Sequence, residues 1–213
     1  MIITDITQQK NNKDRCNVFV DGSYSFATFK EYVIKYNIGI GSEISKELIE
    51  RILVDDEYRA GLDYALKRLS YKQFSKSELT KVLLDKGYDR RTIDIIQNKL
   101  ADYKYIDDAE LSRMIVSDAT NVKKLGKRAV YVKMINRKID SQSAKIAIEK
   151  IMPEDELKNA IEILEKYARK NNYDGKDQKI KQKIYRALAS KGYDWDTIKE
   201  AFVRYGSDDE EEF

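Results

Sequence analysis

The sequence predicts a mainly α-helical protein with a small N-terminal β cap, in which three tandem three-helix repeats form an elongated, curved array. A hairpin pattern fills the first 30 residues, apolar residues recur at helical spacing from about residue 42, and similar turn sequences return about fifty residues apart. The chain has only 9 Gly and 1 Pro in 213 residues, which disfavours a β-sandwich or barrel because those folds need many tight turns.

Residues 1–40 are expected to form the β cap. Residues 17–20 and 23–29 are rich in β-branched and aromatic side chains, and Asp21-Gly22 between them favours a type I′ hairpin turn. Residues 2–7 alternate apolar and polar side chains and predict a third strand. A sheet this small is marginal in water, so we expect it to pack on the helices that follow.

A connecting helix is expected over residues 41–54, because Leu48, Ile49 and Ile52 share one face. The repeats that follow are recognised by their turns. Lys86-Gly87-Tyr88-Asp89 returns as Lys191-Gly192-Tyr193-Asp194, with Arg137-Lys138-Ile139-Asp140 between them at offsets of 51 and 54 residues. The predicted three-helix repeats span residues 55–101, 107–152 and 154–205.

Each joint of the repeat has a physical reason. Free N–H groups and the helix dipole favour acidic residues at a helix start, so an acidic pair is expected to cap the first helix of each unit. These pairs are Asp55-Asp56, Asp107-Asp108 and Glu154-Asp155. Gly87 and Gly192 are expected to end the middle helix in the left-handed conformation. The last helix is predicted to be capped by Asp89, Asp140 and Asp194 in the three units.

The composition excludes most familiar catalytic sites. With no His there is no Ser-His-Asp triad, Cys-His pair or imidazole metal site, and the single Cys16 forms neither an internal disulfide nor a CxxC site. No phosphate-binding loop occurs, and the acidic pairs are interpreted as caps rather than Mg²⁺ ligands. We therefore expect a non-enzyme without a cofactor or metal. Because no apolar run approaches a membrane span, the expected location is cytoplasmic.

The charge is unevenly distributed. Residues 208–212 are all acidic, so the remaining chain carries +8 although the net charge is only +3 (3 + 5). Residues 206–213 are expected to be a disordered tail that competes for basic side chains, because consecutive acids repel one another and bury no apolar surface.

The basic residues supply the candidate site. Residues 122–145 carry eight cations against one acid, and the equivalent helix of the last repeat is also basic. A solvated charged face is the alternative, but the same sign on equivalent helices favours a polyanionic partner, either nucleic acid or an acidic protein groove. The candidate binding residues are Lys123, Lys124, Lys127, Arg128, Lys133, Arg137, Lys138, Lys179, Lys183 and Arg186.

The order and spacing of several segments resemble the RecX family of bacterial recombination regulators, over nearly the whole chain. The carriers are residues 65–69, Ser77-Glu78-Leu79, residues 83–88, Tyr105-Ile106-Asp107-Asp108, Gly126-Lys127-Arg128 and residues 187–193. Two positions depart from the family pattern: Phe74 stands where an Arg usually precedes Ser75, and Lys138 replaces the turn Gly of the middle unit. The second departure puts the left-handed geometry of that turn in doubt, because Lys adopts positive φ less readily than Gly.

The resemblance implies a monomeric modulator that binds RecA filaments on single-stranded DNA, directly or through the filament, and restrains strand exchange, ATP hydrolysis and LexA-type cleavage. Two other functions stay open at this point. The basic surface could serve a free-standing nucleic-acid-binding module, or the repeats could form a structural adaptor for an acidic protein.

Overall fold

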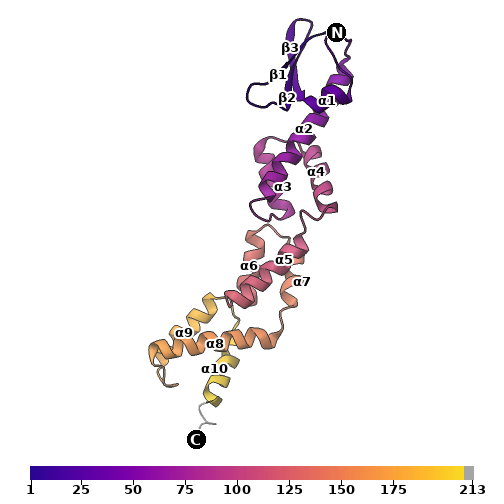
Figure 1. Cartoon of the computed structure of the whole chain (residues 1–213). Coiled ribbons are helices and arrows are strands. Elements are labelled where there is room, and N and C mark those ends of the chain that lie inside the picture. The colour runs from indigo at the N-terminus through magenta and orange to yellow at the C-terminus, as the bar shows by residue number, and fades with distance from the viewer. Residues whose placement is uncertain (209–213) are drawn as a thin grey trace. The chain divides into compact units, whose positions relative to one another are not determined.

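A computed structural model describes residues 1–208 and confirms the mainly α class with an N-terminal three-stranded sheet (Figure 1). The chain forms two compact units. Unit 1 contains residues 1–72 and 79–105, and unit 2 contains residues 73–78 and the chain from residue 106 onward.

The elements of the sheet and the first helices are β1 (Ile3–Gln8), β2 (Arg15–Val20), β3 (Ser23–Phe29), α1 (Lys30–Lys35), α2 (Lys46–Leu69), α3 (Lys76–Lys86) and α4 (Arg90–Asp102). The following helices are α5 (Asp108–Ser117), the π-helix η1 (Asp118–Val122), α6 (Lys127–Asn136), α7 (Ser141–Glu149), α8 (Pro153–Asn171), α9 (Gln178–Ser190) and α10 (Trp195–Asp208). Residues 206–208 are therefore helical, which corrects their assignment to the tail. The rest of the predicted tail lies outside the described residues.

The sheet is antiparallel with the strand order β1-β2-β3. Asp21 and Gly22 both have positive φ (49° and 82°), which confirms the predicted hairpin turn. Every second residue of β2 is buried, and two of these residues, Val18 and Val20, join a core with α1 and the first half of α2. Figure 1 shows the strands and α1 beside the start of α2. The cap is therefore packed on a helix, as its small size requires.

The predicted helix start at Asp55 is wrong, because α2 runs without a break through Lys46–Leu69. The N-cap is Ser45, whose hydroxyl accepts the Leu48 N–H at 3.2 Å. Asp55 and Asp56 lie in the middle of α2 and attach the cap to it. The connecting helix and the first helix of the predicted first repeat are one element, since both share a continuous helical pattern that no residue interrupts.

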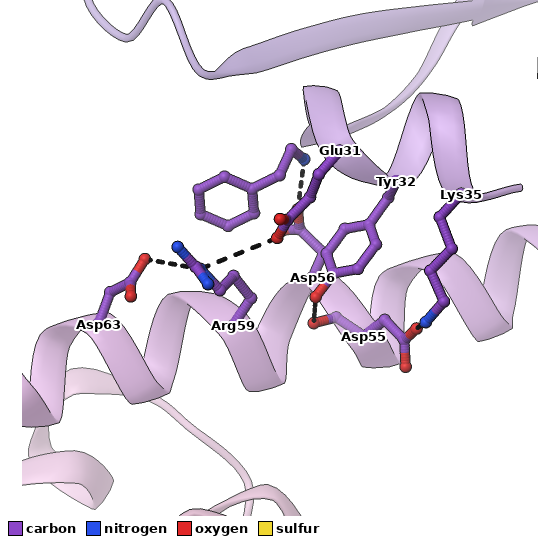
Figure 2. A network of polar contacts seen from close by, with 8 residues as sticks. Glu31, Tyr32, Lys35, Asp55, Asp56, Arg59 and Asp63 are labelled. Atoms are coloured by element: carbon purple, nitrogen blue, oxygen red, sulfur yellow. Dashed lines mark hydrogen bonds and ion pairs between the residues drawn. The ribbon is translucent and has the colours of Figure 1, made fainter.

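Asp56 is the buried centre of this attachment. Its carboxylate is 2.7 Å from the Arg15 guanidinium and accepts the Phe29 N–H at 2.9 Å. The neighbouring Asp55 carboxylate accepts a hydrogen bond from Lys35, while the Asp55 carbonyl accepts one from the Tyr32 hydroxyl (Figure 2). The Tyr36 hydroxyl also donates to the Asp55 carboxylate. Partial burial opposes ionisation of Asp55, but the two side-chain donors hold its pKa below the ordinary value.

Replacing Asp56 with Asn should lower the free energy of unfolding of unit 1 by about 1.5–3 kcal/mol, because the Arg15 guanidinium would lose its charged partner in a mostly buried place. Urea unfolding followed by circular dichroism measures this. Asp63→Asn is the matched control on the same helix. Its ion pair with Arg59 is exposed and is worth only about 0.3–0.5 kcal/mol. Equal losses for the two variants would contradict the role given to Asp56.

The rest of unit 1 is helical. The helices α2, α3 and α4 each contribute buried apolar side chains to it. Gly61 of α2 lies so close to α4 that an added Cβ would come within 2.6 Å of the Ile96 side chain. Gln97 of α4 donates to the Thr80 hydroxyl of α3 at 2.6 Å. A small residue at 61 thus permits the close approach of α2 and α4.

Unit 2 contains two helical cores. The first is formed by α5, η1, α6 and α7, with Val130 and Met134 of α6 fully buried. The second is formed by α8, α9 and α10, with Leu164, Ile184 and Leu188 among its fully buried side chains. The helices α5, α6 and α7 have 10 residues or fewer and would be marginally stable alone in water, so they depend on packing in the first core.

The predicted joints between helices are mostly confirmed. Gly87, Lys138 and Gly192 all have positive φ after α3, α6 and α9. The N–H groups at the start of the next helix donate hydrogen bonds to the carboxylates of Asp89, Asp140 and Asp194. Asp107 caps α5, and Glu154 and Asp155 lie in the first turn of α8. Lys138 adopts φ 59°, so the middle turn keeps its left-handed geometry without Gly.

Candidate partner-binding surface

The start of α6 is held by α8 and by the loop after α9. Its N-cap is Gly126, which has no side chain to cap the helix. The Lys127 N–H instead donates to the buried Glu156 carboxylate at 2.7 Å, and the Arg128 N–H donates to the Gly192 carbonyl at 3.2 Å. These bonds satisfy N–H groups that the helix itself leaves free.

Two glycines face each other at this contact. A Cβ at Gly126 would lie 2.6 Å from the Gly192 carbonyl carbon and oxygen. A Cβ at Gly192 would lie 2.3 Å from the Ala129 nitrogen. The Tyr193 hydroxyl beside them is buried, donates to the Lys124 carbonyl at 2.9 Å, and has its pKa raised mainly by that burial. Tyr193 therefore packs inside unit 2 against the loop that precedes α6.

Three candidate lysines next to α6 form ion pairs within unit 2. Lys123 contacts the Asp118 carboxylate, Lys124 lies 3.2 Å from Glu162, and Lys127 lies 3.4 Å from Glu156. Because the Lys123 ammonium donates to it, and because Lys133 adds positive charge nearby, Asp118 has a pKa below the ordinary value. The positive charges of these lysines are therefore partly neutralised by acidic side chains of the same unit.

Arg137 is also paired within the protein, although its side chain is only partly buried. Its guanidinium is 2.9 Å from the Glu78 carboxylate and donates to the Gln73 carbonyl at 2.7 Å, all within unit 2. Arg137, a candidate binding residue, is therefore engaged in an ion pair within the protein. The partners are 59 residues apart in the sequence, so spacing within one helix could not reveal the pair.

Replacing Arg137 with Ala should destabilise unit 2 by about 1.5–3 kcal/mol, because the half-buried Glu78 carboxylate and the Gln73 carbonyl lose a charged donor. Chemical unfolding of the two proteins gives the difference. Lys138→Ala is the matched control, since Lys138 is exposed and forms no ion pair within 4 Å among residues 1–208. A similar loss in the control would refute the assignment.

The other candidate cations are more accessible. Arg128 and Lys138 are exposed at the two ends of α6, and Lys133 is half-buried between them. Lys179, Lys183 and Arg186 are all exposed on α9. They recur at i, i+4 and i+7 and therefore share one face of that helix. Within the described part of the chain, no ion pair involves these three residues or Arg128.

The accessible charge is therefore divided between residues 122–145 and α9, while Lys127 and Arg137 are paired with acidic side chains of the protein. Lys183 donates to the Asn171 side chain at 2.7 Å, a neutral partner that leaves the ammonium charge uncompensated. Arg128 lies near Asp194, whose pKa is lowered first by the Thr197 N–H and also by this cation. The exposed surface formed by Arg128, Lys179, Lys183 and Arg186 is called here the basic face.

No helix in residues 1–208 combines the length and apolarity that crossing a membrane requires. In the same part of the chain, no three His, Cys, Asp or Glu residues are grouped so that they could hold a metal ion.

Comparison with known proteins decides the family. Residues 1–45 match the model of the RecX regulatory protein N-terminal domain, and residues 154–202 match that of the third three-helix domain of RecX. Regulatory protein RecX of Clostridioides difficile (strain 630) is 35% identical over 93% of this chain and 92% of its own. The chain belongs to the RecX family. RecX of Bacillus subtilis (strain 168) is 29% identical over 99% of this chain and 80% of its own.

Solved RecX structures share the fold. The crystal structure of a regulatory protein RecX matches with a TM-score of 0.69 and 24% identity, covering 93% of this chain and 98% of the other. RecX from Lactobacillus salivarius matches with a TM-score of 0.66 and 23% identity, covering 70% and 97%. These two matches show a shared fold. The sequence relatives, which are named as regulatory proteins, confirm the resemblance to the RecX family.

Proposed function

We propose that this RecX-family protein binds RecA filaments on single-stranded DNA and lowers their strand-exchange, ATPase and coprotease activities without catalysing a reaction itself. The observation that carries the proposal is the basic face, where four exposed cations from α6 and α9 have no ion-pair partner in the described chain. Such a surface suits the phosphates or the acidic groove of a nucleoprotein filament.

Several weak contacts would act together. An exposed ion pair contributes only about 0–1 kcal/mol, so no single cation would hold the protein on a filament. The predicted tandem repeats would allow contacts with neighbouring RecA subunits, and linked contacts strengthen one another through effective concentration. Weak, multiple and salt-sensitive binding is the expected behaviour of a regulator that must also dissociate.

The test is RecA-dependent ATP hydrolysis on single-stranded DNA, with this protein added below the RecA concentration. Slower hydrolysis and slower strand exchange are expected. Unchanged rates at saturating protein would refute the proposal. We also propose that the protein is cytoplasmic and monomeric. Sedimentation would report the monomer as a mass near 24.9 kDa.

A free-standing nucleic-acid-binding module is the second candidate, and the same basic face favours it. Binding to DNA with equal affinity in the presence and absence of RecA, without any effect on RecA, would support this alternative. A structural adaptor for an acidic protein would instead bind neither DNA nor the filament.

A further inference from the structure

A second feature of unit 2 is a groove between α9 and α10 with a volume of about 510 Å³. Its walls carry Lys181 and Tyr185 from α9 and Trp195, Lys199 and Phe202 from α10. Lys181 and Tyr185 are one helical turn apart, and the α10 residues recur at i, i+4 and i+7. Each helix therefore presents one row of side chains to the groove.

The aromatic side chains of the groove are partly open to solvent. Trp195 is the only Trp of the chain, and 61% of its surface is exposed although large aromatic side chains are usually mostly covered. The Tyr185 ring lies beside it, with ring centroids 5.1 Å apart and planes inclined by 59°. Tyr185 is half-buried against the α8–α10 core, so it supports the indole from a rigid base.

Cations accompany these rings. The Lys181 ammonium lies 5.6 Å from the centre of the Phe202 ring, and Lys199 is exposed. Among the residues that the structure describes, no acidic side chain lines the groove. Of the acidic residues next to lining residues in the sequence, Asp177 and Asp194 accept N–H groups at the starts of α9 and α10, and Glu200 pairs with Arg204. Asp196 is exposed in the first turn of α10. The groove therefore combines aromatic faces with positive charge.

We propose that this groove binds single-stranded nucleic acid, with a base stacked on Trp195 and Tyr185 and the adjoining phosphates near Lys181 and Lys199. Aromatic faces in a positively charged groove are the pattern by which proteins bind single strands without reading their sequence. An apolar peptide would leave the two ammonium groups without partners, and a duplex keeps its bases stacked inside. The charge and the exposed rings together select an unpaired strand.

The groove and the basic face use different sides of α9. Lys181 lies two positions from Lys179 and from Lys183, so it points roughly to the opposite side of the helix, and none of the three α9 cations of the basic face lines the groove. Binding in the groove goes beyond the proposed function, because it would give the protein its own contact with the strand in the absence of RecA.

The fluorescence emission of the Trp195 indole reports binding in the groove directly. Titration of the protein with an oligothymidylate of about 16 nucleotides, without RecA, should quench Trp195 emission, and the quenching should weaken as salt rises. A duplex of equal length and a polyglutamate peptide should quench far less. Quenching by polyglutamate alone, or binding of the oligonucleotide without any change in emission, would overturn the proposal.

Variants measured by anisotropy of a labelled oligothymidylate test the same contact. Trp195→Ala should weaken binding by about 5- to 150-fold and Trp195→Phe should restore most of the affinity, because a ring is what a base stacks on. Tyr71→Ala is the control, since Tyr71 is 74% exposed and belongs to unit 1, whereas all residues that line the groove belong to unit 2. Equal affinity of the Trp195→Ala and natural proteins would refute the proposal.

The contribution of Lys181 and Lys199 is measured separately, by the salt dependence of the binding constant. Lys181→Gln and Lys199→Gln should each reduce the salt slope of log K by about 0.7. Unchanged slopes would contradict the phosphate contacts. Because these assays contain no RecA, their failure would leave the effect on RecA ATP hydrolysis unaffected, and the two proposals are tested independently.

Discussion

Replacing Gly192 with Ala should destabilise unit 2 by about 2–5 kcal/mol. The new Cβ would lie 2.3 Å from the Ala129 nitrogen, and the backbone would hold an L side chain at φ 89°. Overpacking typically costs about 1–3 kcal/mol, and left-handed geometry adds about 1–2 kcal/mol. Urea unfolding followed by Trp195 emission measures the loss directly, because the only Trp of the chain lies in unit 2.

Substitutions at two further glycines separate the cost of overpacking from the cost of the left-handed backbone conformation. Gly126→Ala should lose only the packing part, since its φ is an ordinary −75° while its Cβ would lie 2.6 Å from Gly192. Gly87→Ala should lose only the conformational part in unit 1, since its φ is 98° but nothing lies within 4 Å of the added Cβ. If Gly192→Ala is no more harmful than Gly87→Ala, the close contact between the two loops is not important for stability.

Reversing the four charges of the basic face should abolish filament binding at physiological salt while preserving the fold. The variant carries Glu at positions 128, 179, 183 and 186, all of which are exposed helical positions that accept Glu readily. If each cation contacts one phosphate of a single strand, the salt slope of log K should fall by about 3 in total. Anisotropy on RecA–DNA filaments and circular dichroism measure binding and fold.

The matched control reverses the same number of charges in unit 1, at Lys10, Lys13, Lys81 and Arg90, which are also exposed. This variant has the same net charge, so a general electrostatic effect would weaken both equally. Normal inhibition of RecA by a folded basic-face variant would show that these cations are only a solvated surface. Arg137 is excluded from both sets, because its reversal would oppose Glu78 and change stability as well as charge.

Some structural features could be predicted because their cause is local. Asp21 and Gly22 form the predicted turn, and Asp89 and Asp140 cap the predicted helices, since each depends on residues a few positions away. The boundary at Asp55 failed for the opposite reason. An acidic pair is compatible with a helix start, but it equally serves a partner that arrives from elsewhere, here Arg15 and Lys35 of the cap.

The candidate site divides in the same way. The sequence by itself determined that positive charge gathers on the helices of the last two predicted repeats, because composition and helical spacing are visible in one segment. Only the tertiary structure decided which cations are accessible: Lys127 meets Glu156, Arg137 meets Glu78, and the α9 cations meet no acid in the described chain. Tertiary packing likewise brings Gly126 against Gly192 and Tyr185 beside Trp195. Ion pairing and close approach depend on residues far apart in the chain, and their distance in space is set by packing, which no local pattern encodes.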